Sequence, residues 1–275
     1  MTITPTRPAA RRETRPMDGF ADSATMLRRN LRHLVRYPAL IIATISVPVI
    51  MLLLFAYLFG DTISAGVGGP AGGVDYIDYL VPGILLMTIA SGAVQTAVQI
   101  RSDMNEGIVD RFRTMPISRT AVVTGHVLGS VILNVVTVVS VIGVGLALGF
   151  RPTAGLLEWL AVTGLTVLIS FAITWLAVTL GLLAKTVEGA SNTPMVLSFF
   201  LPFLSTTFIP LASLPSGIRW FAEYQPYTPI IQTLRGLLIG GPIGHNGWLA
   251  VCWGVALTIG GYVWSKRLFA RDPQR

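Results

Sequence analysis

The feature that most constrains this chain is a series of apolar segments separated by short polar connections. A helix of about 20 apolar residues crosses the hydrocarbon core of a bilayer, so segments of this length predict membrane spans. Hydrophobic residues make up 52% of the 275 residues and charged residues only 12%, which is more apolar surface than one soluble core buries. We therefore expect an all-α membrane protein with six transmembrane helices. The expected spans are residues 39–59, 79–100, 121–149, 157–184, 190–211 and 247–265.

The basic residues predict how these spans are oriented. If the N-terminus is inside the cell, the inside segments are residues 1–38, 101–120, Lys185 and 266–275. These segments hold all of the 20 Lys and Arg residues except Arg151, Arg219 and Arg235. Cytoplasmic loops carry an excess of Lys and Arg. We therefore expect a multi-pass protein of the cell membrane with both termini in the cytoplasm.

The segments outside the spans have distinct compositions. Residues 1–16 are rich in Pro, Thr and Arg and predict a disordered cytoplasmic tail. Residues 17–38 alternate leucines and arginines at helical spacing, which predicts an amphipathic helix in the headgroup layer. A frayed basic linker is the alternative. Residues 267–275 are expected to be a second cytoplasmic tail.

Residues 101–120 form the one charged island between Tyr79 and Phe150. Its charged members are Arg101, Asp103, Glu106, Asp110, Arg111, Arg113 and Arg119. A short segment of mixed charge can transmit a push through apolar contacts while its charges set the register. We interpret it as a cytoplasmic contact segment through which a partner chain moves the membrane domain. An ordinary solvated loop is the alternative.

The cores of the expected spans contain no Asp, Glu, Lys or Arg. Ion-coupled carriers and intramembrane enzymes keep ionisable groups at mid-depth, so the sequence disfavours both classes. Gln95, Gln99 and Asn134 are the strongest polar groups there, and we expect them to form interhelical hydrogen bonds rather than substrate contacts. Cys252, the single cysteine, is interpreted as a small buried hydrophobe.

The sequence contains no motif typical of a nucleotide-binding or metal-binding site. There is no G-x-x-x-x-G-K-[ST] phosphate loop, and the three histidines lie far apart without nearby cysteines or carboxylates in a metal-binding pattern. The basic residues sit at the ends of apolar segments, which disfavours nucleic-acid binding. We therefore expect neither an enzyme nor a cofactor or metal site in this chain.

Prolines interrupt the segment before the last span. Residues 213–242 predict an outer, re-entrant hairpin of two short helices with a turn at Gln225-Pro226. Thr228 is the expected cap of the second helix. Ile230, Ile231, Leu234, Leu237 and Leu238 should share one face of this helix, with Thr228, Gln232 and Arg235 on the other. Glu223 and Arg235 are expected either to pair or to remain solvated.

The chain resembles the membrane subunits of type-2 ATP-binding-cassette exporters, and among them the daunorubicin-resistance-like drug exporters. The likeness covers nearly everything after Phe20. Its motifs are Arg36-Tyr37-Pro38, Asn105-Glu106-Gly107, Met115-Pro116-Ile117-Ser118-Arg119, Gln225-Pro226-Tyr227-Thr228-Pro229 and Arg235-Gly236. Tyr227 and Pro229 depart from the usual pattern of the family, so we assign them no role.

The resemblance implies a transmembrane domain over residues 39–266, preceded by an elbow helix and containing a cytoplasmic coupling helix. It implies a complex of two permeases, either two copies or two different chains, with two ATPase subunits that bind ATP and Mg. The implied ATPase contacts are Met104, Asn105, Glu106, Gly107, Ile108, Arg111 and Phe112. The implied substrate path, between the permeases, includes Phe199, Phe200, Phe203, Ser205, Thr206, Thr207 and Phe208; core packing or lipid contact is the alternative for each phenylalanine.

The function implied by the resemblance is the permease subunit of an ATP-driven exporter of hydrophobic or amphiphilic drugs or natural products. Export of a lipid or a lipid-linked glycan is the alternative within the class. Outside the class of ATP-driven exporters, the alternatives are a self-sufficient secondary carrier or channel and a membrane enzyme.

Overall fold

The computed structural model describes residues 38–66, 76–106, 119–208, 211 and 215–271, and these residues form eight helices and no strand. The helices are α2 (Pro38–Gly66), α3 (Tyr76–Asn105), α5 (Arg119–Ala147), α6 (Leu156–Leu183), α7 (Val187–Phe203), α8 (Ser216–Tyr224), α9 (Tyr227–Ile239) and α10 (Asn246–Arg271). The expected tail 1–16, all but the last residue of the expected elbow helix 17–38, and residues 107–118 of the expected coupling loop 101–120 lie outside the described residues.

Four of the described helices are long and apolar enough to cross a membrane: α3, α5, α6 and α10. The apolar stretch described in α2, Thr44–Leu58, is shorter, and α7 has 17 residues. The all-helical architecture of a membrane protein is therefore confirmed. The number of six spans remains a prediction.

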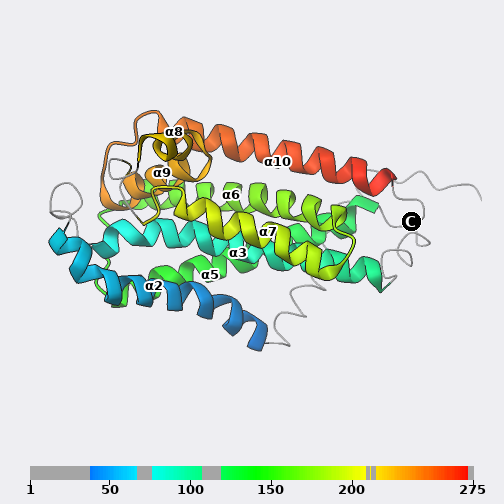
Figure 1. Ribbon diagram of the computed structural model, residues 1–275, viewed down its shortest axis with the longest axis horizontal. Coiled ribbons are helices and arrows are strands. Elements are labelled where there is room, and N and C mark those ends of the chain that lie inside the picture. Colours follow the sequence, from blue (N-terminus) through cyan, green and yellow to red (C-terminus); the bar gives the residue numbers. More distant parts are fainter. Residues whose placement is uncertain (1–37, 67–75, 107–118, 209–210, 212–214, 272–275) are drawn as a thin grey trace, which may run out of the picture.

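The long helices lie side by side in a bundle, with α3 in its interior (Figure 1). The apolar window of α3 is 83% buried, whereas that of α10 is 17% buried. Helix α3 contacts α2, α5, α6, α7 and α9, and α10 packs along α6. The short helices α8 and α9 lie at one end of the bundle, here called the hairpin end (Figure 1). The opposite end contains the last turns of α3, α6 and α10.

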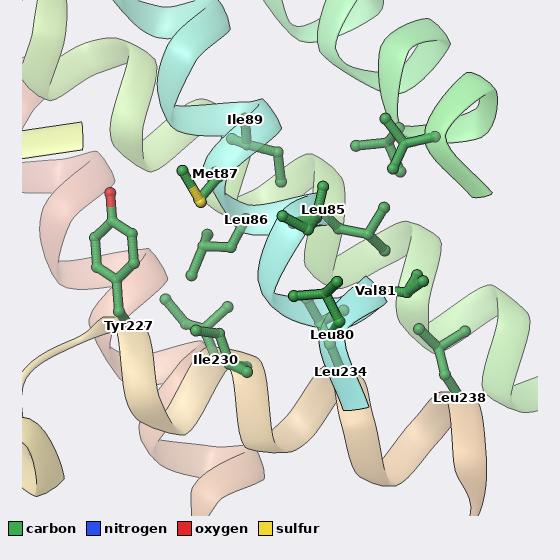
Figure 2. Close-up of a cluster of buried hydrophobic side chains, with 14 of the residues drawn as sticks. Leu80, Val81, Leu85, Leu86, Met87, Ile89, Tyr227, Ile230, Leu234 and Leu238 are labelled. Atoms are coloured by element: carbon green, nitrogen blue, oxygen red, sulfur yellow. The ribbon is translucent and has the colours of Figure 1, made fainter. Parts of the chain in front are cut away.

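The apolar core is concentrated at the hairpin end, where α9 packs against α3 (Figure 2). Leu80 and Leu86 of α3 belong to the same cluster as Ile230 and Leu234 of α9, and all four are almost fully buried. Each such side chain contributes about 1.5–3 kcal/mol when it is fully removed from water. In a membrane protein the same residues act mainly through close packing, because lipid is also apolar.

Several helix ends differ from the expected span boundaries. Helix α7 ends at Phe203 rather than near residue 211, because Ser205 Oγ donates a hydrogen bond to Pro202 O (2.7 Å) and stabilises a turn instead of another helical turn. Helix α10 continues to Arg271, five residues into the expected C-terminal tail.

The expected helical hairpin is present, with its turn at Gln225 and Pro226. Gln225 is buried, and its side-chain Nε2 donates to Leu204 O at the end of α7. The expected cap was wrong: Pro226 is the N-cap of α9, and Thr228 lies inside the helix. The helix ends at Gly240, whose φ of 75° is left-handed and whose N–H donates to Gly236 O (3.1 Å).

Candidate functional site

A cavity of about 500 Å³ lies among α2, α3, α5 and α7. Its lining residues are Thr44, Val47, Ser91, Val94, Gln95, Gln99, Leu133, Ser191, Met195, Ser198 and Phe199. None of these side chains is charged, and the polar ones are hydroxyls and amides. A ligand pocket of this size that is mostly apolar with a few convergent polar groups suits a small amphiphilic molecule.

The central helix α3 supplies the amides of this cavity. Gln95 and Gln99 are one helical turn apart, so both side chains lie on the same face of α3, and both are exposed. The opposing wall comes from α7, which is tied to α3 by a hydrogen bond from Ser198 Oγ to Ala90 O (3.3 Å). The arrangement places two hydrogen-bonding groups in an otherwise apolar hollow.

The expectation that Gln95, Gln99 and Asn134 hydrogen-bond between helices is wrong for the described residues. The two glutamines face the cavity, and the buried amide of Asn134 has no hydrogen-bond partner there. Asn134 instead packs tightly on Gly92, where an added Cβ would lie 1.9 Å from Asn134 Oδ1. Glycine at position 92 therefore permits the close approach of α3 and α5.

The phenylalanines expected along a substrate path lie in three different settings. Phe199 lines the cavity. Phe200 and Phe203 are 64% and 55% exposed on α7. Phe208 is buried and stacks on Phe55 of α2, with ring centroids 4.3 Å apart. The structure therefore brings only Phe199 of this set to the cavity, and a path along the others stays a prediction.

Ser205, Thr206 and Thr207 form a buried turn after α7 and are absent from the lining of the cavity. The hydroxyls of Ser205 and Thr207 are 2.7 Å apart. The backbone carbonyl of Thr206 accepts a hydrogen bond from the Tyr79 hydroxyl (3.1 Å). Within the chain, these residues connect the end of α7 to α3.

Arg235 of α9 completes this connection, and its position contradicts both alternatives expected for it, a pair with Glu223 and exposure to solvent. The guanidinium is buried and lies 3.6 Å from the centroid of the Tyr79 ring. Its Nη2 donates to Tyr79 O and to Thr206 O, both at 3.0 Å. Glu223 is exposed on α8 and forms no ion pair with Arg235.

The polar face of α9, with Thr228, Gln232 and Arg235, is also largely buried, because α9 contacts α3, α6 and α10. Thr228 and Arg235 are buried and Gln232 is half-buried. The pattern of apolar and polar residues in α9 predicts one buried face. In the structure, contacts with several helices bury most of α9.

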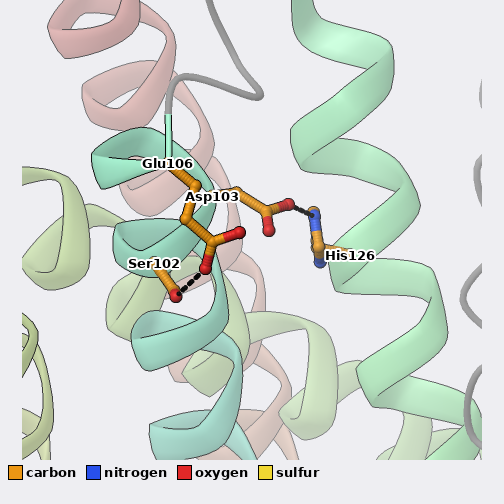
Figure 3. A network of polar contacts seen from close by, with 4 residues as sticks. All are labelled: Ser102, Asp103, Glu106 and His126. Carbon is orange, nitrogen blue, oxygen red and sulfur yellow. Dashed lines mark hydrogen bonds and ion pairs between the residues drawn. The ribbon is translucent and has the colours of Figure 1, made fainter.

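At the opposite end, the last turn of α3 carries the described part of the expected ATPase contact. Met104 packs against the cluster of Ile100 and Val123, while Asn105 and Glu106 are exposed. The Ser102 hydroxyl donates to Glu106 Oε1 (3.0 Å; Figure 3). The remaining expected contacts, Gly107, Ile108, Arg111 and Phe112, lie outside the described residues.

Two contacts that the sequence did not suggest fix this end of α3. Asp103 Oδ2 lies 3.0 Å from His126 Nε2 of α5 (Figure 3). Arg101 Nη2 donates to Lys185 O, just after α6 (2.7 Å). An acidic residue at the end of one apolar segment and a histidine at the start of the next is the signal that could have indicated the first contact. The end of α3 is thereby tied to α5 and α6.

Comparisons with known proteins identify the family. The model of the ABC-2 type transporter family matches residues 23–239. Over 228 residues the chain is 28% identical to the daunorubicin resistance ABC transporter permease protein DrrB1 of Streptomyces coeruleorubidus, covering 82% of this chain and 78% of that protein. It is 32% identical over 193 residues to the probable doxorubicin resistance ABC transporter permease protein DrrC of Mycobacterium tuberculosis, covering 66% and 68%.

A more distant relative is the inner membrane transport permease YadH of Escherichia coli, 23% identical over 206 residues, which cover 74% of this chain and 79% of that protein. The family match spans the helices that build the cavity, the last turn of α3 and the α8–α9 hairpin. The chain therefore belongs to the ABC-2 type transporter family.

Proposed function

We propose that this chain is the permease subunit of an ABC exporter that moves a hydrophobic or amphiphilic small molecule out of the cell. The observation that carries the proposal is the uncharged cavity of about 500 Å³ among α2, α3, α5 and α7, in a chain that belongs to the ABC-2 type transporter family. Its apolar walls match an apolar substrate, and Gln95 and Gln99 offer hydrogen bonds that orient it.

The names of two relatives support a drug-like substrate. Proteins of Streptomyces coeruleorubidus and Mycobacterium tuberculosis that share 28% and 32% identity with this chain are described as daunorubicin and probable doxorubicin resistance permeases. By this similarity the proposed cargo of the present chain is a hydrophobic or amphiphilic drug or natural product. Export of a lipid or a lipid-linked glycan is the competing outcome of the test below.

The energy for transport is proposed to come from a separate ATPase subunit, which binds ATP and Mg. Its docking surface is the end of α3 with the loop after it: Met104, Asn105, Glu106, Gly107, Ile108, Arg111 and Phe112. Asn105 lies six positions after Gln99 of the cavity wall, a rise of about 9 Å at 1.5 Å per residue. A displacement at the end of α3 would therefore reach the cavity directly.

The same proposal sets the topology of the complex. Six spans cross the cell membrane, with both termini and the end of α3 in the cytoplasm, and the α8–α9 hairpin re-enters the membrane from outside. Two permeases, either two copies of this chain or this chain with another, form the path between them. The exposed Phe200 and Phe203 of α7 are available to line that path.

The test is co-purification with the ATPase, followed by ATP hydrolysis measured with and without candidate drugs in proteoliposomes. We expect drugs to stimulate hydrolysis in the wild type and Glu106→Arg to abolish most of this stimulation, because it reverses an exposed charge at the docking surface. Arg219→Glu, a reversal of an exposed charge on α8, is the control and should keep the stimulation.

Other results would reject the proposal or shift it. Stimulation by extracted lipids but by no drug would favour lipid or glycan-lipid export. Uphill transport by the chain alone on an ion gradient, without nucleotide, would contradict dependence on an ATPase. Normal stimulation in Glu106→Arg would remove the assigned docking surface while leaving the permease function intact.

A further inference from the structure

We infer that a groove between the α8–α9 hairpin and α10 binds organic cations that carry an apolar body. This inference rests on the proposed export function and narrows its substrate class to positively charged amphiphiles. The groove is separate from the cavity described above, since the two have no lining residue in common. It lies at the hairpin end, the end away from the proposed ATPase surface (Figure 1).

The groove has a volume of about 830 Å³, within the range that holds a drug-sized molecule. Its lining residues are Leu211, Glu223, Tyr224, Thr228, Pro229, Gln232, His245, Asn246, Leu249, Cys252, Trp253 and Ala256. Those on α10 run from Asn246 to Ala256, which at 1.5 Å per residue is about 15 Å of helix. An elongated amphiphile therefore fits along α10.

The charge of the groove favours a cation. Glu223 is the one carboxylate in its lining, and no Lys or Arg lines it. No ion pair to Glu223 is formed by the described basic residues, although Arg219 lies one helical turn earlier on α8. Arg235 of α9 is engaged with Tyr79 and Thr206 instead. A ligand cation would thus meet an unpaired carboxylate.

Aromatic and polar groups complete the recognition. Tyr224 and Trp253 line the groove and are 63% and 36% exposed. Aromatic faces attract cations and also pack against apolar rings. Thr228 is 4% exposed, and its buried hydroxyl has no hydrogen-bond partner in the described part of the chain. A polar group that reached this hydroxyl would satisfy it.

Cys252 provides a direct test, because it is the one cysteine of the chain, it lines the groove, and it is exposed rather than buried as the sequence suggested. The full chain is placed in phosphatidylcholine nanodiscs, and the rate of Cys252 alkylation by N-ethylmaleimide is measured. Tetraphenylphosphonium and tetraphenylborate, which share shape and differ in charge, are the competing probes. We expect the cation to slow alkylation and the anion to leave the rate unchanged.

The variant Glu223→Gln tests the assigned carboxylate. Its half-protecting concentration of tetraphenylphosphonium should rise about two- to fivefold, the effect expected of one partly exposed ion pair. Glu223→Asp keeps the charge and should protect better than Glu223→Gln. Glu188→Gln removes an exposed carboxylate of α7 at the opposite end and should behave as the wild type.

Three results would overturn the inference. Protection by tetraphenylborate as well as by tetraphenylphosphonium would indicate partition into lipid. Unchanged protection in Glu223→Gln would remove the carboxylate from the site. Alkylation that is rapid in detergent but blocked in phosphatidylcholine without any probe would show that lipid fills the groove. None of these results concerns ATP hydrolysis. Loss of drug-stimulated hydrolysis with the ATPase would reject the proposed function, whereas charge-selective protection reports on the groove alone.

Discussion

The two halves of the central helix α3 are packed in different ways. At the hairpin end, bulky residues such as Leu80 and Ile84 pack against α9, and the buried guanidinium of Arg235 is inserted between α3 and the turn after α7. Toward the opposite end, Ala93 and Ala97 meet Ala177 of α6 through a small, close-packed seam. One half therefore depends on inserted side chains and the other on close approach of helix backbones.

This difference has a consequence for movement. A cation held by two carbonyl oxygens and an aromatic ring has one favourable position, so the hairpin end should behave as a fixed unit. The last turn of α3 is held by single polar contacts such as Asp103 with His126, and a typical hydrogen bond of this kind contributes only about 0.5–1.5 kcal/mol. We expect a push at that end to displace α3 there while the hairpin end stays assembled.

The largest expected effect comes from reversing the buried charge. Arg235→Glu would place a carboxylate near the carbonyl oxygens of Tyr79 and Thr206, which would lose their donor and repel the new negative charge. Breaking a buried charged contact in this way costs about 3–5 kcal/mol. We expect a poor yield and a lower midpoint of thermal unfolding in detergent. Tryptophan fluorescence measures this midpoint.

The matched control for this change is Arg219→Glu, because Arg219 is an exposed arginine on the neighbouring helix α8. Its free energy of unfolding should lie within about 0.5 kcal/mol of that of the wild type, as is usual for substitutions at exposed positions. An Arg235→Glu protein as stable as this control would mean that the guanidinium does not hold the hairpin end, and the comparison between the two halves would fail.

A smaller loss is expected from filling the close-packed seam. In Gly181→Ala the new Cβ would lie 2.8 Å from Ala97 O and 3.0 Å from Ala97 Cα. Backbone atoms cannot rotate away, so α3 and α6 must separate, and we expect a loss of about 1–3 kcal/mol in the free energy of unfolding. The same fluorescence-monitored thermal unfolding measures it.

Gly164→Ala in the same helix provides the control, since no atom lies within 4 Å of its added Cβ. Alanine is favoured over glycine inside a helix by about 1 kcal/mol, so this variant should be at least as stable as the wild type. Equal loss in both variants would point to helix α6 itself rather than to its contact with α3.

Much of the fold could be predicted from sequence because apolar segment length determines spans in lipid. The hairpin turn at Gln225-Pro226 was also predictable, since prolines limit where helices begin. The end of α7 was not, because the apolar character continues past Phe203 while the local hydrogen bonds of Ser205 end the helix. Hydropathy reports where a chain prefers lipid and carries no information about such local competition.

Positions of the candidate site residues were less predictable. Hydropathy does not show which face of a helix meets a cavity, so Phe199 and Phe200 were equivalent in the sequence although one lines the cavity and the other is exposed outside it. The role of Arg235 depended on Tyr79, 156 residues earlier in the chain. A long-range contact between a cation and a backbone carbonyl leaves no pattern in a single sequence.

The smallest expected effect tests the polar end of α3. Asp103 and His126 lie 3.0 Å apart, with His126 buried and Asp103 half-buried, so their interaction should contribute about 0.5–1.5 kcal/mol, the net value of a typical hydrogen bond. A double-mutant cycle with Asp103→Ala, His126→Ala and the double variant isolates this interaction from the separate effects of each truncation. Ser102→Ala, which removes the neighbouring hydroxyl bonded to Glu106, controls for a general disturbance of the last turn.

A coupling energy of several kcal/mol would mean that this end is held as firmly as the hairpin end, because only a well-desolvated pair reaches that size. A small coupling energy, together with a large loss in Arg235→Glu, would leave the last turn of α3 as the part of the helix that a partner can displace at least cost.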